Sequence, residues 1–589
     1  MSTHSGLFTF DEARGTLTQG AGAAWLGETR SSGVSRLPSG LAATFDGRID
    51  NRNDLLRRLA LASSETPADA DLALAIFDRW GIDGLRSMVG DWSLAVWDGA
   101  ARTVHLARDY MGARPLYYCL DARYVAWSTD LAGLVTRTGR RDALSDRFAA
   151  GFMGLRLSPE TTPYNGVHAV PPGVCVSIAA GGRVTRRAFW TLEAGEIRYP
   201  DARQYEDQLY ALWREAVQAR LRTGGTVWAE LSGGLDSSSV VCMVDRLIKH
   251  GDVAPQAMRL VSHATLQSPE GDERRFIAEV ERQVGVTSDI VAVEDHQEHT
   301  DRDRAWVTPY ALHGVGLETV RRVRSGGGRV VLSGRLGDAI MGCQPDNSVA
   351  VFDDLARGAA LTALRNLRAW SRATRKPFLE IAWKLLAPDS LTPPDSGAGL
   401  LAPPLQAMLQ EIPPIEVPRG LRRSKRALAR MVLGYSAGAR LDVPDRAPDI
   451  VYVYPFAHRP LVEFMLAIPG EQLSAPGTTR SLMRRAFTGL VPPRVLRRVS
   501  KGYYPPAAFR AAPRLVASML PVHELEVVQR GWIDPVQLRS AIQTLTDGSG
   551  QTGGDIHAVL RLERWLQSRR DSHGMPTRKE VNTHEVLHA

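Results

Sequence analysis

Lysine is the scarcest of the charged residues in this chain. The 589 residues include 72 lysines and arginines, and only 6 of these are lysines. The formal net charge of +8 therefore comes from arginine, and a lysine inside a motif is informative. No block of five or six consecutive basic residues occurs, so the sequence does not indicate a nucleic-acid-binding tail.

Cysteine is also rare, and long apolar runs are absent. The four cysteines are widely spaced without a CxxC pair, which excludes a disulfide framework and a cysteine zinc site and favours the reducing cytoplasm. Neither a signal peptide nor an apolar run of 18 residues is present, so we expect no membrane insertion. At this length, 44% hydrophobic residues suffice for the cores of two or more domains.

The N-terminal third of the chain alternates short apolar runs with turns. Residues 41–51 and 90–100 show the period-two alternation of strands in an antiparallel or mixed sheet. Helical patterns over 53–61 and 69–80 interrupt these strands. We therefore predict a layered α/β domain over residues 1–195.

The next segment alternates strands with helices. Strand patterns over 226–231, 258–264 and 289–293 are separated by helical runs, which predicts parallel strands with crossover helices. Beyond residue 350 the pattern is mostly helical, so we predict a second domain over 205–570. The sequence further predicts a long proline-rich loop over 387–420 and a disordered polar tail over 571–589.

The strongest local signal is the SGGLDSS loop, Ser232 to Ser238, between a predicted strand and a predicted helix. Small residues let backbone N–H groups close around an oxyanion at the helix N-terminus, and the serine hydroxyls add donors. Asp236 inside the loop is suited to Mg²⁺, which prefers carboxylate oxygen. A Walker A loop needs Gly-Lys, and none of the lysines follows a glycine, so cleavage between the α- and β-phosphates is favoured. A Gly-Ser turn formed by chance is the alternative, which the strand and helix flanks disfavour.

This loop resembles that of the PP-loop ATP pyrophosphatases, specifically their asparagine-synthetase-like branch. Residues 332–342, LSGRLGDAIMG, are similar to the family's second Mg²⁺-pyrophosphate loop, although Ala339 stands where an acidic residue is usual. Residues 454–469 and 477–487 resemble later segments of the same family. Residues 496–504, LRRVSKGYY, are similar to its basic segment, in which a lysine stabilises pyrophosphate and the transition state.

The resemblance implies ATP and Mg²⁺ as cofactors and a parallel-sheet ATP pyrophosphatase domain with added helices. It implies catalytic roles for Asp236, Asp338 and Lys501, with Mg²⁺ on the two aspartates. Without the family, Lys501 would be read as an ordinary surface lysine. The implied ATP and pyrophosphate site comprises Leu231, Ser232, Gly233, Gly234, Leu235, Asp236, Ser237, Ser238, Val261, Ser333, Gly334, Arg480, Arg484 and Lys501.

Residues 1–195 resemble the class II glutamine-amidotransferase domain of the same synthetases, which implies an αββα fold. Its catalytic residues are altered: Ser5 stands in the position of the nucleophilic cysteine, four residues inside the chain. Asp46 replaces the asparagine of the oxyanion element, and Arg48 replaces the glutamate that binds glutamine. Removal of Met1 could expose Ser2 as a nucleophile, but the changes at Asp46 and Arg48 argue against glutaminase activity.

The family resemblance implies adenylation of a carboxylate, followed by attack of an amine that does not come from glutamine. Asparagine synthetases carry Glu and β-lactam synthetases Tyr at the position of Arg335, which can be neither a general base nor a phenolic relay. We therefore predict a macrolactam synthetase that resembles lasso-peptide cyclases. Its partners would be a precursor peptide, a leader-binding protein and a leader peptidase. An ammonia-dependent asparagine synthetase, a β-lactam synthetase and a non-catalytic scaffold remain alternatives.

One further motif match has no supporting context. Residues 584–588, HEVLH, match the HExxH pattern of zinc proteases. The match has no downstream ligand and falls in the polar tail, so we interpret it as a chance match.

Overall fold

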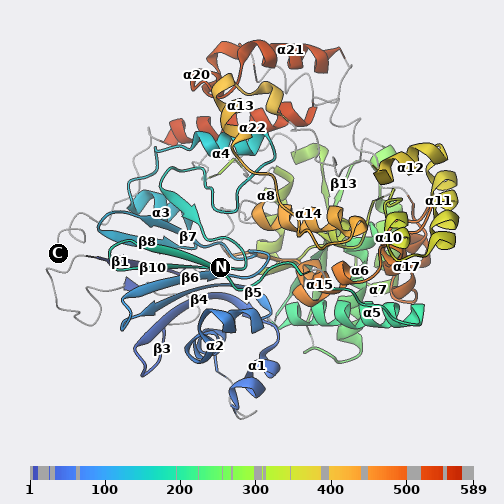
Figure 1. Ribbon diagram of the computed structural model, residues 1–589, viewed down its shortest axis with the longest axis horizontal. Coiled ribbons are helices and arrows are strands. Elements are labelled where there is room, and N and C mark those ends of the chain that lie inside the picture. Colours follow the sequence, from blue (N-terminus) through green and yellow to red (C-terminus); the bar gives the residue numbers. More distant parts are fainter. Residues whose placement is uncertain are drawn as a thin grey trace.

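The structure is a computed structural model of the chain (Figure 1). It describes residues 4–10, 25–26, 34–61, 67–193, 195–222, 225–254, 256–266, 269–296, 308–309, 314–344, 346–386, 397–438, 449–499, 519, 521–547 and 553–572.

The N-terminal part is a sandwich of two antiparallel sheets between helices (Figure 1). One sheet has the order β2 (Trp25–Leu26), β1 (Ser5–Thr9), β8 (Tyr124–Ser128), β7 (Tyr117–Leu120), β9 (Val167–Ala169). The other has the order β11 (Val184–Ala188), β10 (Val174–Ala179), β6 (Thr103–Arg108), β5 (Gly90–Asp98), β4 (Leu41–Ile49), β3 (Ser35–Arg36). Helices α1 (Arg52–Leu59), α2 (Asp69–Gly84), α3 (Leu131–Arg137) and α4 (Asp146–Met153) complete this part.

The layering follows from the apolar faces of the strands. Phe8, Trp97, Trp127 and Val176 are buried in a cluster to which both sheets contribute. Helix α2 contacts β4 of one sheet, and α3 contacts β7 and β8 of the other. The predicted αββα fold is confirmed.

The part of the chain after the sandwich contains a third sheet, in which all strands are parallel. Its order is β14 (Ser288–Ala292), β13 (Met258–Ala264), β12 (Val227–Glu230), β15 (Val330–Leu332), β16 (Val451–Val453). Helices α5 (Ala202–Gln218), α6 (Leu235–Lys249), α7 (Arg274–Val284) and α8 (Gly314–Ser325) accompany these strands. The predicted parallel sheet is confirmed. The sequence did not indicate β16, a three-residue strand set among helical segments.

Most of the remaining chain is helical, as predicted. These helices are α9 (Gly337–Ile340), α10 (Ala350–Ala356), α11 (Ala360–Thr374), α12 (Phe378–Leu386), α13 (Pro403–Gln410), α14 (Arg423–Gly438), α15 (Arg459–Ala467), α16 (Gly470–Leu473), α17 (Ser481–Ala486), α18 (Pro493–Leu496), α20 (Glu526–Gln529), α21 (Pro535–Thr546) and α22 (Gly553–Ser572). None of the helices in the described ranges is long and apolar enough to span a membrane.

The prediction of one continuous loop over 387–420 was wrong, because α13 lies inside it. Proline is tolerated in the first turn of a helix, where the missing N–H would have no partner, and Pro403 and Pro404 occupy that turn. Residues 387–396 lie outside the described part of the chain, as do residues 573–589 of the predicted tail.

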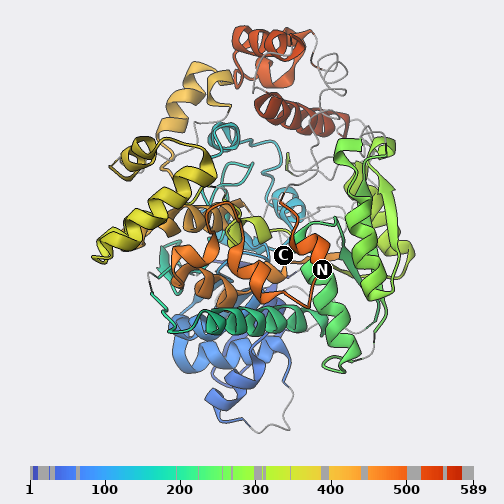
Figure 2. The ribbon, with the colours of Figure 1, turned by 90° about the vertical axis from the view of Figure 1, so that its right-hand side faces the viewer.

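A helical layer joins the two ends of the chain. Helices α13 and α22 contact α4, and α20 and α21 contact α22 (Figures 1 and 2). One hydrophobic cluster contains Phe148 and Tyr164 from the N-terminal part together with Trp532 and Trp565 near the C-terminus. The last helices therefore pack on the N-terminal part, which the division at residues 195–205 did not predict.

Candidate functional site

Two loops meet at the carboxyl ends of neighbouring parallel strands. The 232–238 loop follows β12, the 333–338 loop follows β15, and these strands pair in parallel register. Two glycines set how closely the loops approach. A Cβ on Gly334 would lie 2.6 Å from the Ser237 backbone nitrogen, and a Cβ on Gly337 would lie 2.4 Å from Cγ of Asp236. Any side chain at these positions would separate the loops.

The two predicted metal-binding aspartates converge on one arginine. Arg480 Nη2 lies 3.1 Å from Oδ2 of Asp236 and also forms an ion pair with Oδ1 of Asp338. Arg480 caps the N-terminus of α17 with φ at 55°, a left-handed conformation that is uncommon for a residue with a side chain. The guanidinium offsets the repulsion between the two carboxylates. Three predicted site residues are therefore brought together.

The serine-rich loop presents hydroxyl and backbone donors at the start of α6. Ser232 Oγ and Ser237 Oγ lie 2.9 Å apart, and the Ser232 backbone N–H donates to Ser237 Oγ at 3.0 Å. Ser238 Oγ is buried and has no hydrogen-bond partner among the described residues. Gly233, with φ at 70°, gives the loop its turn. An unsatisfied hydroxyl at a helix N-terminus suits an anionic oxygen, as in a phosphate.

The donor set fits a magnesium ion shared with a phosphate ligand. The described residues contain no group of three or more His, Cys, Asp or Glu side chains that could hold a metal. Mg²⁺ commonly takes one or two protein carboxylates and completes its shell with water and substrate phosphates. Asp236 and Asp338 can supply those carboxylates, and the buried Ser238 hydroxyl lies in the loop that would receive the phosphates.

Other predicted site residues lie at the ends of the strands that precede the two loops. The Leu231 backbone N–H donates to the carbonyl of Val261 at 2.9 Å, and Val261 is buried on β13. The Ser333 hydroxyl donates to Glu230, and the Arg335 backbone N–H donates to Ser333 Oγ at 3.3 Å. These contacts fix the strand ends from which both loops begin.

Arg484 has a different environment from Arg480. Its guanidinium donates to the backbone carbonyls of Thr479, Leu496 and Arg498. Burial lowers the pKa of Arg484, and the charge of Arg480 acts in the same direction. Arg484 thus ties α17 to the residue before its N-cap and to the end of α18, and its contact with phosphate stays a prediction.

Arg498 is a site residue that the sequence did not single out. Its Nη1 donates to the Gly233 carbonyl at 3.1 Å, and its Nη2 pairs with Glu273. The signal for it is the LRRVSKGYY segment, in which the family resemblance points to the lysine. Lys501 itself lies outside the described residues. The arginine three positions earlier ties this basic segment to the serine-rich loop.

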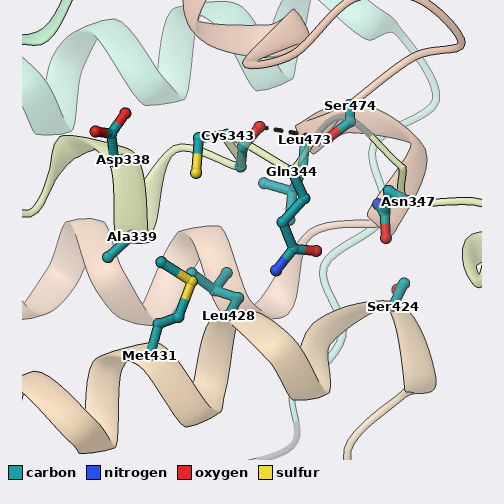
Figure 3. Close-up of a pocket in the computed structure, with 11 residues that line it drawn as sticks. Asp338, Ala339, Cys343, Gln344, Asn347, Ser424, Leu428, Met431, Leu473 and Ser474 are labelled. Atoms are coloured by element: carbon teal, nitrogen blue, oxygen red, sulfur yellow. Dashed lines mark hydrogen bonds between the residues drawn. The ribbon is translucent and has the colours of Figure 1, made fainter. Parts of the chain in front are cut away.

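A small cavity lies beside Asp338, between the 338–347 segment and α14 (Figure 3). Its volume of about 10 Å³ admits roughly one water molecule. Asn347 lines the cavity, is 2% exposed, and has an Oδ1 without a hydrogen-bond partner in the described structure. The cavity therefore offers a buried hydrogen-bond acceptor next to the second loop.

Comparison with known proteins identifies the family of the chain. The model of the asparagine synthase family matches residues 208–567, more than half of the chain. The chain belongs to the asparagine synthase family. The model of the glutamine amidotransferase domain matches residues 35–190.

Named relatives of this family are similar over parts of the chain. An amidase of Gibberella zeae, chry2, is 26% identical over 47% of this chain and 43% of its own length. Asparagine synthetase [glutamine-hydrolyzing] 3 of Bacillus subtilis is 23% identical over 78% of this chain and 74% of its own length. Carboxyethyl-arginine beta-lactam-synthase of Streptomyces clavuligerus is 31% identical over 40% of this chain and 42% of its own length. The chain thus spans less than half the length of the first of these relatives.

In this asparagine synthase family member, the N-terminal strand that begins at Ser5 is preceded by a fixed histidine. The two ring nitrogens of His4 each lie 3.0 Å from a hydroxyl, those of Thr44 and Ser93. Burial lowers the pKa of His4 to about 4, although the Asp46 carboxylate acts in the opposite direction. Ser5 therefore follows a residue that is locked inside the sandwich.

A buried charge cluster surrounds Arg48, the residue that replaces the predicted glutamine-binding glutamate. The Arg48 guanidinium lies 2.7 Å from Asp50 and 2.8 Å from Asp91. Burial opposes its charge, yet the two carboxylates raise the pKa of Arg48. Arg220, which follows α5, lies 3.4 Å from Asp91 and 3.8 Å from Asp50. The cluster, Arg48, Asp50, Asp91 and Arg220, thus joins the amidotransferase-like and synthetase parts through fully paired charges.

Proposed function

We propose that this chain is an ATP- and Mg²⁺-dependent ligase that forms an amide and releases AMP and pyrophosphate. The convergence of Asp236 and Asp338 on Arg480, beside the serine-rich loop, is the observation that carries the proposal. A carboxylate oxygen of the substrate attacks the α-phosphorus of ATP, and pyrophosphate leaves toward the loop. An amine then attacks the activated carbonyl and displaces AMP.

Each residue has a definable part in this reaction. The two aspartates would hold Mg²⁺, which supplies charge neutralisation for the phosphates when bound. Backbone N–H groups and hydroxyls of residues 232–238 bind the leaving pyrophosphate at the positive end of α6. Arg480 and Lys501 add positive charge where negative charge develops in the transition state.

We further propose that the substrate is a peptide and the product a macrolactam, as in lasso-peptide cyclases. An Asp or Glu side chain of a core peptide would be adenylated, and the peptide's N-terminal amine would attack it. Arg48, paired with Asp50 and Asp91, stands where a glutamate would bind glutamine, which argues against glutamine as the amine source. Arg335 can be neither a general base nor a phenolic relay, which argues against an asparagine synthetase or a β-lactam synthetase. A precursor peptide, a leader-binding protein and a leader peptidase would be the partners, acting in the cytoplasm.

The β-lactam synthase similarity favours a second candidate of the same chemistry. The Streptomyces clavuligerus protein has the highest identity of the relatives named above, at 31%. A small-molecule carboxylate with an internal amine would then replace the peptide.

Pyrophosphate exchange separates these candidates. The full chain is incubated with ATP, Mg²⁺ and candidate core peptides that carry Asp or Glu, and the product mass is measured. Exchange that depends on the peptide, with a product lighter by one water, is expected. The Lys501→Ala variant should lose product formation.

Other outcomes identify the alternatives. Asparagine formed from aspartate and ammonia would replace the peptide proposal with an asparagine synthetase, and lactam formed from a small molecule would replace it with a β-lactam synthetase. If ATP is not turned over with any carboxylate substrate, only the non-catalytic scaffold remains as an alternative.

A further inference from the structure

Helices α11 and α12 form an arm on one flank of the molecule (Figures 1 and 2). Only one face of α11 is buried, through Ala363, Leu367 and Trp370, which cluster with Ile381 of α12. The opposite faces of both helices are exposed, and their composition is unusual for a solvated surface.

Exposed apolar side chains are concentrated on this arm and the helix before it. Six of the eleven exposed large hydrophobic residues in the described chain lie between residues 355 and 383. Leu361 is 80% exposed, Leu379 is 78% exposed and Trp383 is 72% exposed. Leu379 and Trp383 are four residues apart, so they lie on one face of α12. Exposed apolar side chains gathered on neighbouring helices are typical of an interaction surface.

The exposed face of α11 carries a row of arginines beside Leu361 and Leu364. Arg365, Arg368 and Arg372 follow one another at helical spacing, with Arg375 at the end of the helix. None of the four forms an ion pair with any described residue. Residues 360–386 contain six basic residues and one acidic residue.

Other basic segments of the chain differ from this arm. Arg422 on the approach to α14 pairs with Glu196, and Arg423 stacks on the ring of Phe352. Arg480 and Arg498 pair with carboxylates at the site. Within the described residues, the arginines of α11 have no such carboxylate partners, so we infer that their charge is available to a ligand.

Packed helices link the arm to the proposed active site. Helix α10 follows the segment that lines the cavity beside Asp338, and it contacts α11, α14 and α16. Helix α16 contacts α17, whose N-cap is Arg480. The arm and the two loops thus belong to one packed set of helices.

We propose that the α11–α12 arm is a docking surface for an acidic, amphipathic segment of the peptide substrate. This inference rests on the proposed peptide substrate. Guanidinium groups pair with carboxylates in bidentate geometry, and Trp and Arg are the residues most enriched at protein interfaces. An anionic membrane fits less well, because interfacial helices need a broad apolar face. The apolar face of α11 is buried against α12, and its exposed face mixes arginines with Leu361 and Leu364.

Binding to a defined probe tests the proposal without catalysis. The probe is a fluorescein-labelled 15-residue peptide with Glu and Leu at helical spacing, and a peptide with Lys in place of Glu is its control. The wild-type chain should bind the acidic probe, and binding should weaken in about 0.5 M salt because the contacts are exposed charges. The R365E/R368E/R372E variant should bind at least tenfold more weakly. Leu379→Ala with Trp383→Ala should weaken binding severalfold at unchanged salt dependence.

A matched variant controls for net charge. Arg203, Arg539 and Arg561 are exposed on α5, α21 and α22, so R203E/R539E/R561E changes the total charge equally away from the arm. This control should bind the probe as the wild type does. Three results would overturn the proposal. These are equal loss of probe binding in both triple variants, no loss in the arm variant, or arm-dependent binding to phosphatidylglycerol vesicles in place of the peptide. The binding measurement contains no ATP, so it is independent of catalysis. Peptide-dependent pyrophosphate exchange without probe binding would refute only the proposed role of the arm. Probe binding without exchange would refute the proposed ligase function.

Discussion

Arg480 occupies the space between two carboxylates that the sequence assigned to a metal ion. Asp236 is 9% exposed, so its charge needs a partner inside the protein. In the structure that partner is the guanidinium, which also reaches Asp338. Arg480 thus keeps the two carboxylates of the proposed site paired and close together.

Replacing Asp338 with asparagine tests the metal-binding role. We expect Asp338→Asn to lower the rate of pyrophosphate exchange at least a hundredfold, about 3 kcal/mol, because a neutral amide is a weaker ligand for Mg²⁺. The Asp338 side chain is 43% exposed, so the free energy of unfolding should change by less than about 1 kcal/mol. Exchange is measured across Mg²⁺ concentrations. Asp449→Asn, which removes a surface partner of Arg324, is the control and should keep wild-type activity; a similar loss there would argue against a specific role for Asp338.

His4 should make stability depend on pH. Its pKa falls from 6.5 to about 4 on folding, so the neutral ring stabilises the fold above pH 6.5 and this contribution is lost as pH falls toward 4. The loss should be about 3 kcal/mol. Burial raises the pKa of Asp109 to about 6, and the Asp91 charge acts in the same direction. Asp109 therefore adds stability as pH falls through this range, which opposes the effect of His4. Urea denaturation of wild type and His4→Gln between pH 7 and 4 isolates the histidine, and equal pH dependence of the two proteins would contradict the assignment.

At the scale of elements, the close packing of the two loops depends on glycine. Gly337→Ala would place a methyl group against the Asp236 carboxylate, whereas Gly554 of α22 faces open space. We expect Gly337→Ala to abolish most exchange activity and to cost about 1–3 kcal/mol of unfolding free energy. Gly554→Ala should leave both unchanged or slightly raise stability. Activity and denaturation of the two variants check this, and full activity of Gly337→Ala would show that the loops can separate without harm.

Local patterns predicted these elements well, because short-range features encode them. The strand, glycine turn and helix around Ser232 are contiguous in sequence, and period-two alternation identified β4 and β5. The contact between Arg498 and Gly233 joins residues 265 positions apart, and no local pattern records it. Likewise, α13 was hidden by prolines that also permit a helix start.

At the scale of the whole molecule, the Arg48 cluster connects the two parts of the chain. Arg220→Met should leave Asp50 and Asp91 with less positive charge in a buried site and cost about 3–5 kcal/mol. Arg214→Met removes a half-exposed pair with Asp252 from the preceding helix, and it should cost at most about 1 kcal/mol. Chemical denaturation of both variants provides the comparison. Equal costs would mean that the cluster adds nothing beyond an ordinary surface pair.

The helical layer built by α4 and α22 constrains the order in which this chain can fold during synthesis. Domains generally fold from the N-terminus as the ribosome releases them. Here Phe148 and Tyr164 belong to the same hydrophobic cluster as Trp565. The first unit to be translated, residues 1–195, therefore keeps part of this apolar surface uncovered until synthesis has passed Trp565. A nascent chain paused before α22 should be a substrate for chaperones.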